Sequence, residues 1–147
     1  MPARLLFLTT QESKNRLIPA LNDSNVQQVI DAPVTVIVAH DLKFYQHVKR
    51  LFPAYDTTSL FTENEPLAND LAYRNGSLQG AYMMMAARTI GLDVGPMSGF
   101  DNASVDKTFF DGTSLRSNFL CNLGYGDAEK LYPRGPRLAF EEVCTLL

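Results

Sequence analysis

Residues 91–100 read GLDVGPMSGF, and this stretch says most about the fold. Gly95, Pro96 and Gly99 give it an unusual backbone path, because glycine permits positive φ and proline locks φ. A loop of this kind can direct main-chain N–H groups at a planar ligand with no side chain in the way. The alternative is an ordinary turn, for which two glycines and a proline are equally typical.

A second cluster lies downstream, where residues 132–137 read YPRGPR. Arg134 and Arg137 flank a Gly-Pro pair, and guanidinium groups bind phosphates and carboxylates through paired hydrogen bonds. The cluster therefore indicates a clamp for an anion. Two solvated loop arginines are the alternative interpretation.

A long helix is predicted directly before residues 91–100. Apolar side chains recur at helical steps through residues 65–91, and Gly91 is a natural C-cap. The methionines at 83–85 are interpreted as core filling rather than as a cofactor contact. Small residues are unusually dense in this segment, so we expect a second helix, or a partner subunit, to approach it closely; they are Ala68, Ala72, Gly76, Gly80, Ala81, Ala86 and Ala87.

Three segments are predicted to be strands: residues 3–10, 33–39 and 117–125. Residues 33–39 read PVTVIVA, a nearly continuous apolar run rich in β-branched residues, which is typical of a central strand buried on both faces. Strands interleave with helices, so the chain mixes α and β structure in one domain. The pattern does not distinguish a parallel from an antiparallel sheet.

Four further helices and several loops complete the predicted order. Three of these helices have candidate N-caps: Ser13 for the helix at 11–21, Asp41 for 41–52 and Asp101 for 101–110. Phe61 is interpreted as the anchor of a surface loop, with a lid or partner contact as the alternative. The helices are expected at 11–21, 41–52, 101–110 and 139–146, and the loops or connections at 22–25, 57–66, 92–100 and 126–136.

Composition excludes several classes of protein. The 147 residues carry a formal net charge of −3 and no run of Lys or Arg, so we expect no nucleic-acid partner. No apolar run is long enough to span a bilayer, and the N-terminus lacks a signal-peptide pattern, so we expect a cytoplasmic protein. There is no G-x-S-x-G motif to indicate hydrolysis by a nucleophilic serine.

Cysteine and histidine usage predicts neither disulfides nor a metal. Cys121 and Cys144 lie far apart in the sequence and share no CxxC spacing, so both are expected to be buried, inert thiols. His40 and His47 have no cysteine partner at metal-ligand spacing, so we expect no metal site.

The order of the motifs resembles that of the nitroreductase family. In sequence they are NGSLQGAY at 75–82, residues 91–100, NFLCNLGYGD at 118–127, residues 134–137 and FEEVC at 140–144. The resemblance covers the whole chain and is most specific at 95–101 and 122–127. It is closest to the malonic semialdehyde reductase (3-hydroxypropionate dehydrogenase) branch, which acts in pyrimidine breakdown.

The resemblance implies a fold, a cofactor and a set of site residues. The fold is α+β, with a mostly antiparallel sheet flanked by helices, and the protein is a homodimer with one FMN per subunit. Hydride passes from NADH or NADPH to the flavin and then to a small acceptor, so no side-chain nucleophile is expected. Pro96, Met97, Ser98 and Gly99 would line the edge of the flavin ring. Arg134 and Arg137 would contact the FMN phosphate.

The resemblance also implies that the family's N-terminal segment is missing. Family members carry a basic FMN-phosphate motif and an Asn near the ring just upstream of the segment that matches Pro2, Ala3 and Arg4. Residues 1–147 are therefore expected to form one nitroreductase-like domain that is incomplete at its N-terminus. Three functions follow: a reductase of malonic semialdehyde, a general nitro or quinone reductase, or a flavin-free remnant without activity.

Overall fold

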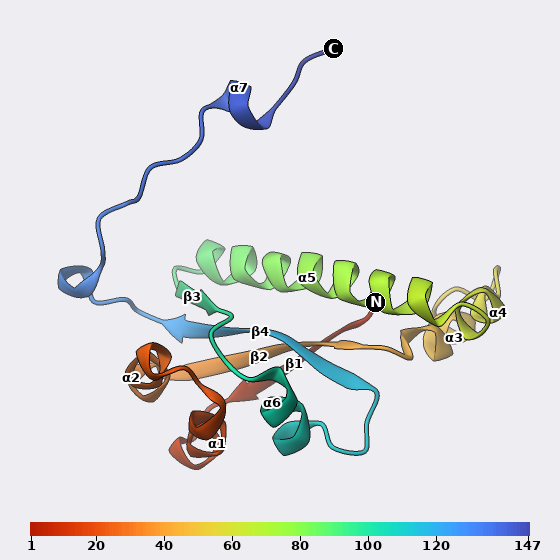
Figure 1. Ribbon diagram of the computed structural model, residues 1–147, viewed down its shortest axis with the longest axis horizontal. Helices are drawn as coiled ribbons and strands as arrows, with labels where there is room; N and C mark the ends of the chain where they lie inside the picture. The colour runs from red at the N-terminus through yellow and green to blue at the C-terminus, as the bar shows by residue number, and fades with distance from the viewer.

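Four antiparallel strands form one sheet in the order β1-β2-β4-β3. The computed structural model describes residues 1–147, and Figure 1 shows the sheet with helices on both faces. The strands are β1 (Ala3–Leu8), β2 (Val34–Asp41), β3 (Asp93–Met97) and β4 (Leu115–Gly124). The α+β class with a mostly antiparallel sheet, which the resemblance implied, is confirmed.

The central strand is β2, as its apolar run predicts. It pairs with β1 on one side and β4 on the other, and all of its residues after Val34 are buried. The ladder with β4 shifts register between Val38 and Ala39, which is the signature of a β-bulge. The outer strands β1 and β3 leave one edge of the sheet each without a partner strand.

One face of the sheet is covered by the long helix α5 (Glu65–Thr89), which lies above the strands in Figure 1. The side chains that it buries are small: Ala68, Ala72, Gly76, Gly80 and Ala87. A Cβ on Gly76 would lie 2.8 Å from the Cβ of His40, so the helix backbone approaches β2 closely. Within the chain, these small residues therefore admit the sheet rather than a second helix, which corrects the prediction.

The other face is covered by shorter helices, namely α1 (Gln11–Leu17), η1 (Ile18–Ala20), α2 (Asp23–Asp31) and α6 (Asn102–Phe109). Leu17, Val29 and Val105 are fully buried there against Ile37 and Leu120 of the sheet. This larger of the two apolar clusters holds the helices in place because it removes their apolar faces from water.

Two caps and one buried cation stabilise this layer. The N-cap of α1 is Thr10, and Ser13 completes the capping box as the third helical residue, so the prediction of Ser13 as the cap was wrong. Asp101 caps α6, as predicted. Lys14 is buried, and its Nζ donates to the carbonyls of residues 30 and 32 at 2.7 Å each, which satisfies the C-terminal end of α2.

Several elements form in segments that were expected to be loops, including a short helix within 57–66 and a 3-10 turn within 126–136, and two of them show the physical reason. Residues 22–25 begin α2, because Asn22 takes the N-cap position and Val29 supplies a buried anchor. Residues 93–97 form β3, whose Gly-Pro sequence has low strand propensity but which pairs with β4 over its whole length. In both cases tertiary pairing or burial outweighs the local sequence.

Residues 41–63 form short helices: η2 (Phe44–His47), α3 (Val48–Leu51) and α4 (Thr58–Thr62). Asp41 belongs to β2 and caps no helix; its carboxylate instead accepts from Arg4 and from the Ser114 hydroxyl, both at 2.7 Å. Phe61 is buried and stacks on Tyr45, which confirms it as the anchor of this segment. None of the helices is sufficiently long and apolar to cross a membrane.

After β4 the chain forms an extended arm, residues 125–147, that leads away from the sheet (Figure 1). It contains only η3 (Ala128–Lys130) and α7 (Phe140–Val143), which is shorter than the helix predicted over 139–146. Every residue of this C-terminal arm is exposed. Cys144 is therefore exposed, in contrast to the prediction, whereas Cys121 is buried as predicted.

Candidate functional site

The turn that follows β3 is the part of the predicted site that lies against the body of the fold. The ladder of β3 with β4 ends at Met97, and the chain then turns through Ser98 and Gly99. The carbonyl of Gly99 accepts from the Asn22 N–H and from the Asn25 side-chain amide, each at 3.0 Å. These two donors, from the start of α2, hold the turn in one position against the body of the fold.

Two backbone donors in this turn have no partner. The N–H groups of Ser98 and Gly99 donate to no acceptor in the chain, although the Ser98 carbonyl accepts from the Phe100 N–H at 3.0 Å. Ser98 is exposed and Gly99 is half-buried, and a half-buried backbone donor is nearly always paired with protein, water or ligand. Adjacent free donors at the end of a strand are therefore available to a ligand with oxygen or nitrogen acceptors.

A cavity of about 350 Å³ lies beside the first of these donors, since Ser98 is one of its lining residues. Its lining comes from three elements: Met84 of α5, Phe119 of β4, and Pro96, Met97 and Ser98 at the end of β3. The volume falls within the range of small-molecule sites, roughly 300–1,000 Å³. Apolar side chains together with a few backbone donors suit a flat aromatic ring with polar atoms along one edge.

Met84 and Phe119 were missed as site residues by the sequence reasoning. Met84 was interpreted as core filling, and Phe119 as one residue of a strand. Both lie on the same side of the sheet, because Phe119 packs against the helix at Gly80. No local signal marks them, since their common position depends on how α5 crosses β4.

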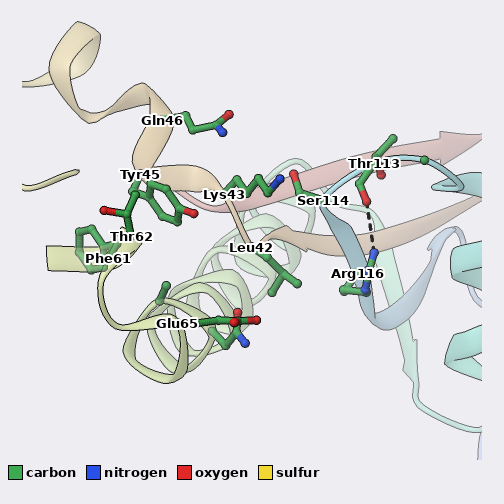
Figure 2. A pocket seen from close by; sticks show the side chains of 13 residues that line it. Leu42, Lys43, Tyr45, Gln46, Phe61, Thr62, Glu65, Thr113, Ser114 and Arg116 are labelled. Carbon is green, nitrogen blue, oxygen red and sulfur yellow. Dashed lines mark hydrogen bonds between the residues drawn. The ribbon is translucent and has the colours of Figure 1, made fainter. Parts of the chain in front are cut away.

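A second cavity, of about 660 Å³, lies near the N-terminal end of α5 (Figure 2). The stacked rings of Tyr45 and Phe61 form one wall, and Lys43 and Arg116 are its cationic residues. Arg116 donates to nearby backbone carbonyls, including that of Thr113 at 3.4 Å. The remaining lining is mostly polar, and the cavity contains none of the residues that the sequence assigned to a site.

The two arginines of the predicted anion clamp lie on the C-terminal arm. Both are exposed, and Arg137 donates to the carbonyls of Gly135 and Pro136 at 2.7 and 3.2 Å. Arg134 makes no hydrogen bond or ion pair within the chain. The structure therefore brings Pro96, Met97, Ser98 and Gly99 together but does not bring the two arginines to them within one chain.

The one buried side-chain nitrogen without a partner is Nδ1 of His40, beneath α5. The imidazole meets the Tyr73 ring edge-on at 5.6 Å between centroids. Burial lowers the pKa of His40 below its ordinary value of 6.5; the carboxylates of Asp106 and Asp41 oppose this, and Arg116 adds to it. Burial of this imidazole therefore disfavours its charged form. No group of three or more His, Cys, Asp or Glu side chains is arranged to bind a metal.

Comparison with known proteins identifies relatives in sequence. A Burkholderia lata protein described as an NADH dehydrogenase/NAD(P)H nitroreductase is 53% identical over 145 residues. The match covers 99% of this chain and 74% of that protein. No protein-family model matches the sequence.

Solved structures share the fold. A Bacillus subtilis protein described as a nitroreductase superposes with a TM-score of 0.88 at 23% identity, over 99% of this chain and 78% of that one. An Exiguobacterium sibiricum protein described as a nitroreductase, solved in complex with FMN, has a TM-score of 0.80 at 18% identity, over 99% and 77% of the two chains. At these identities the likeness demonstrates the fold alone.

Proposed function

Because this chain belongs to the nitroreductase family, we propose that it is an FMN-dependent oxidoreductase that passes hydride from NADH or NADPH to a small acceptor. The name of the Burkholderia relative supports a nicotinamide donor, and the FMN complex of the Exiguobacterium neighbour supports the cofactor. Residues 1–147 act as one nitroreductase-like domain in this proposal.

One observation carries the proposal: the free N–H groups of Ser98 and Gly99 beside the apolar 350 Å³ cavity. A flavin ring is flat and apolar on its faces and carries nitrogen and oxygen acceptors on its edge, so these residues fit it. Bound FMN would supply the hydride-transfer chemistry. Pro96 and Met97 would border the ring, while Ser98 and Gly99 would donate to its edge and so adjust its affinity for hydride.

Arg134 and Arg137 are proposed to bind the FMN phosphate. Their guanidinium groups are exposed and largely free of acidic partners, so they remain available to an anion. Because the C-terminal arm lies away from its own sheet, this contact requires a movement of the arm or a second subunit that holds it.

A homodimer is proposed to hold the arm. The outer face of α5 exposes Leu78 (54%), Tyr82 (75%) and Met85 (64%), and the arm exposes Leu138 and Phe140. Contiguous apolar surface of this kind is rare on monomers. A second copy would cover both surfaces symmetrically. Sedimentation of the purified chain as a dimer is the expected result, and a monomer at micromolar concentration would contradict the proposal.

The acceptor is proposed to be a nitroaromatic, which the name of the Burkholderia relative favours, or else a quinone. Malonic semialdehyde, reduced to 3-hydroxypropionate, is the second candidate and rests on the sequence resemblance of residues 95–101 and 122–127. Turnover of a nitroaromatic, a quinone and malonic semialdehyde by the same preparation, with NADH and then NADPH, distinguishes them. Faster turnover of malonic semialdehyde than of the nitroaromatic and the quinone would make the aldehyde the first candidate.

The cofactor is tested by the visible absorbance spectrum of protein purified with FMN, before and after NADH or NADPH is added without air. A bound yellow chromophore that bleaches is the expected result. A colourless folded protein would leave the flavin-free remnant as the better description of this chain.

The role of the arginines is tested by the double variant R134Q/R137Q. Its matched control, K49Q/R50Q, removes the same charge from exposed positions on α3. We expect the FMN dissociation constant to rise at least tenfold in the first variant only, since charge-assisted bonds to phosphate are lost. Equal affinities in both variants would remove the arginines from the site.

A further inference from the structure

The ring of Phe119 lies directly beneath α5, where the helix has no side chain. A Cβ built on Gly80 would lie 2.5 Å from Cζ and 2.8 Å from Cε1 of this ring, and 3.0 Å from a methyl carbon of Val38. Real Cβ atoms essentially never approach a neighbour below 3.0 Å. The present position of the Phe119 ring therefore requires glycine at residue 80.

The same ring also forms part of the 350 Å³ cavity beside Ser98. Val38, which is fully buried on β2, occupies the side of the ring toward the centre of the sheet, and the helix occupies the space above it. Open space next to the ring lies in the cavity, between Met84 and the end of β3. A side chain at residue 80 would consequently drive the ring toward the cavity.

We propose that Gly80 is a positioning residue for the flavin site, because it lets the Phe119 ring lie beneath α5 and so keeps the cavity beside Ser98 open for the flavin ring. This inference rests on the proposed function. Gly80 touches no ligand in it and acts only through Phe119. The inference also gives a reason for a glycine in the interior of a 25-residue helix, where alanine is intrinsically more stable by about 1 kcal/mol.

The experiment uses the full chain and four variants: G80A, F119L, G80A/F119L and the control G76A. Leucine lacks the Cε and Cζ atoms that the new methyl group of G80A would meet, so F119L removes the clash. G76A makes the same change one turn earlier on α5, where the Cβ meets His40 and not the cavity. FMN affinity is measured by quenching of flavin fluorescence, and thermal unfolding is followed without FMN.

The expected result is an FMN dissociation constant at least tenfold higher in G80A, because overpacking displaces the ring into the site. In G80A/F119L the FMN dissociation constant returns to within about threefold of the value for F119L alone. G76A lowers the melting temperature but leaves FMN affinity within about threefold. Folded G80A with unchanged FMN affinity, or a double variant as weak as G80A, would overturn the inference.

Two further measurements test the role of the Phe119 ring. If G80A does not fold, the single variants F119W and F119L, which keep Gly80, are compared. The larger ring of F119W must weaken FMN binding and the smaller side chain of F119L must not. Equal FMN affinities in these two variants overturn the proposal. Without FMN, F119L must restore the melting temperature lost in G80A. If the unaltered chain binds no FMN, the proposed function itself fails. If the unaltered chain binds FMN and G80A binds it with the same affinity, only the role of Gly80 is removed.

Discussion

Replacement of Gly99 by alanine should destabilise the turn after β3 by a specific clash. The φ of Gly99 lies outside the left-handed region, so the backbone itself tolerates alanine. The new Cβ would lie 2.7 Å from the Asn25 amide nitrogen, whereas ordinary contacts begin at 3.4 Å. A retreat of about 0.7 Å breaks the bond from Asn25 to the Gly99 carbonyl. The lost bond and the overpacking together cost about 2–3 kcal/mol.

The assay is a double-mutant cycle by urea unfolding of the flavin-free protein. N25A alone loses one hydrogen bond and should cost about 1 kcal/mol, since Asn22 still donates to the same carbonyl. N25A also removes the nearest atom that the new methyl meets and leaves only the Asn22 amide nitrogen, at 3.0 Å, so N25A/G99A should cost only about 1–2 kcal/mol in total. The two single costs sum to about 3–4 kcal/mol, so the expected coupling is about 2 kcal/mol below additivity.

The matched control for this cycle is G95A, on the strand β3 that precedes the turn. A Cβ at Gly95 meets only the Cβ of Asn122 at 3.5 Å, which is an ordinary contact. We expect its free energy of unfolding to stay within about 0.5 kcal/mol of the unaltered chain. Additive costs for N25A and G99A, or a cost for G95A as large as that for G99A, would refute the assignment of the clash.

Three further outcomes are expected. Because burial lowers the pKa of His40 below 6.5, the unfolded chain takes up the proton first as pH falls. The free energy of unfolding should therefore decrease as the pH is lowered below 6.5, and H40Q should flatten that slope in urea titrations at each pH. K14M should cost about 1–3 kcal/mol by thermal or urea unfolding, because the α2 carbonyls lose their buried donor; a cost below 0.5 kcal/mol would contradict this. A thiol reagent should label one cysteine, Cys144, in the native protein and Cys121 only in denaturant, since Cys121 is buried with a raised pKa; rapid native labelling of both would show otherwise.

Sequence reasoning predicted the elements whose signal is local. The apolar run at 33–39 is enough to specify a central strand, and the steps of apolar residues after Glu65 specify the long helix. The Asp101 cap follows from one side chain and the N–H groups next to it. These features depend on neighbours within one or two turns of chain, which the sequence displays directly.

Elements that depend on a distant partner were missed. Residues 93–97 read as a turn because Gly and Pro have low strand propensity, and only pairing with β4 makes them a strand. The small residues of α5 indicated a close approach, but the approaching surface is the sheet rather than a helix. The spacing of small and apolar residues identifies the buried face of a helix, but it does not identify the element that packs against that face.

The candidate site divides in the same way. The motif at residues 91–100 and the pair Arg134 and Arg137 were visible in the sequence, and the family resemblance came from the order of such motifs. Only the tertiary structure identified the free N–H groups of Ser98 and Gly99, and the Phe119 ring beside them under Gly80. A hydrogen bond left unmade, and a cavity between three elements, are properties of side chains and peptides brought together across the chain, so no local pattern of residues can encode them.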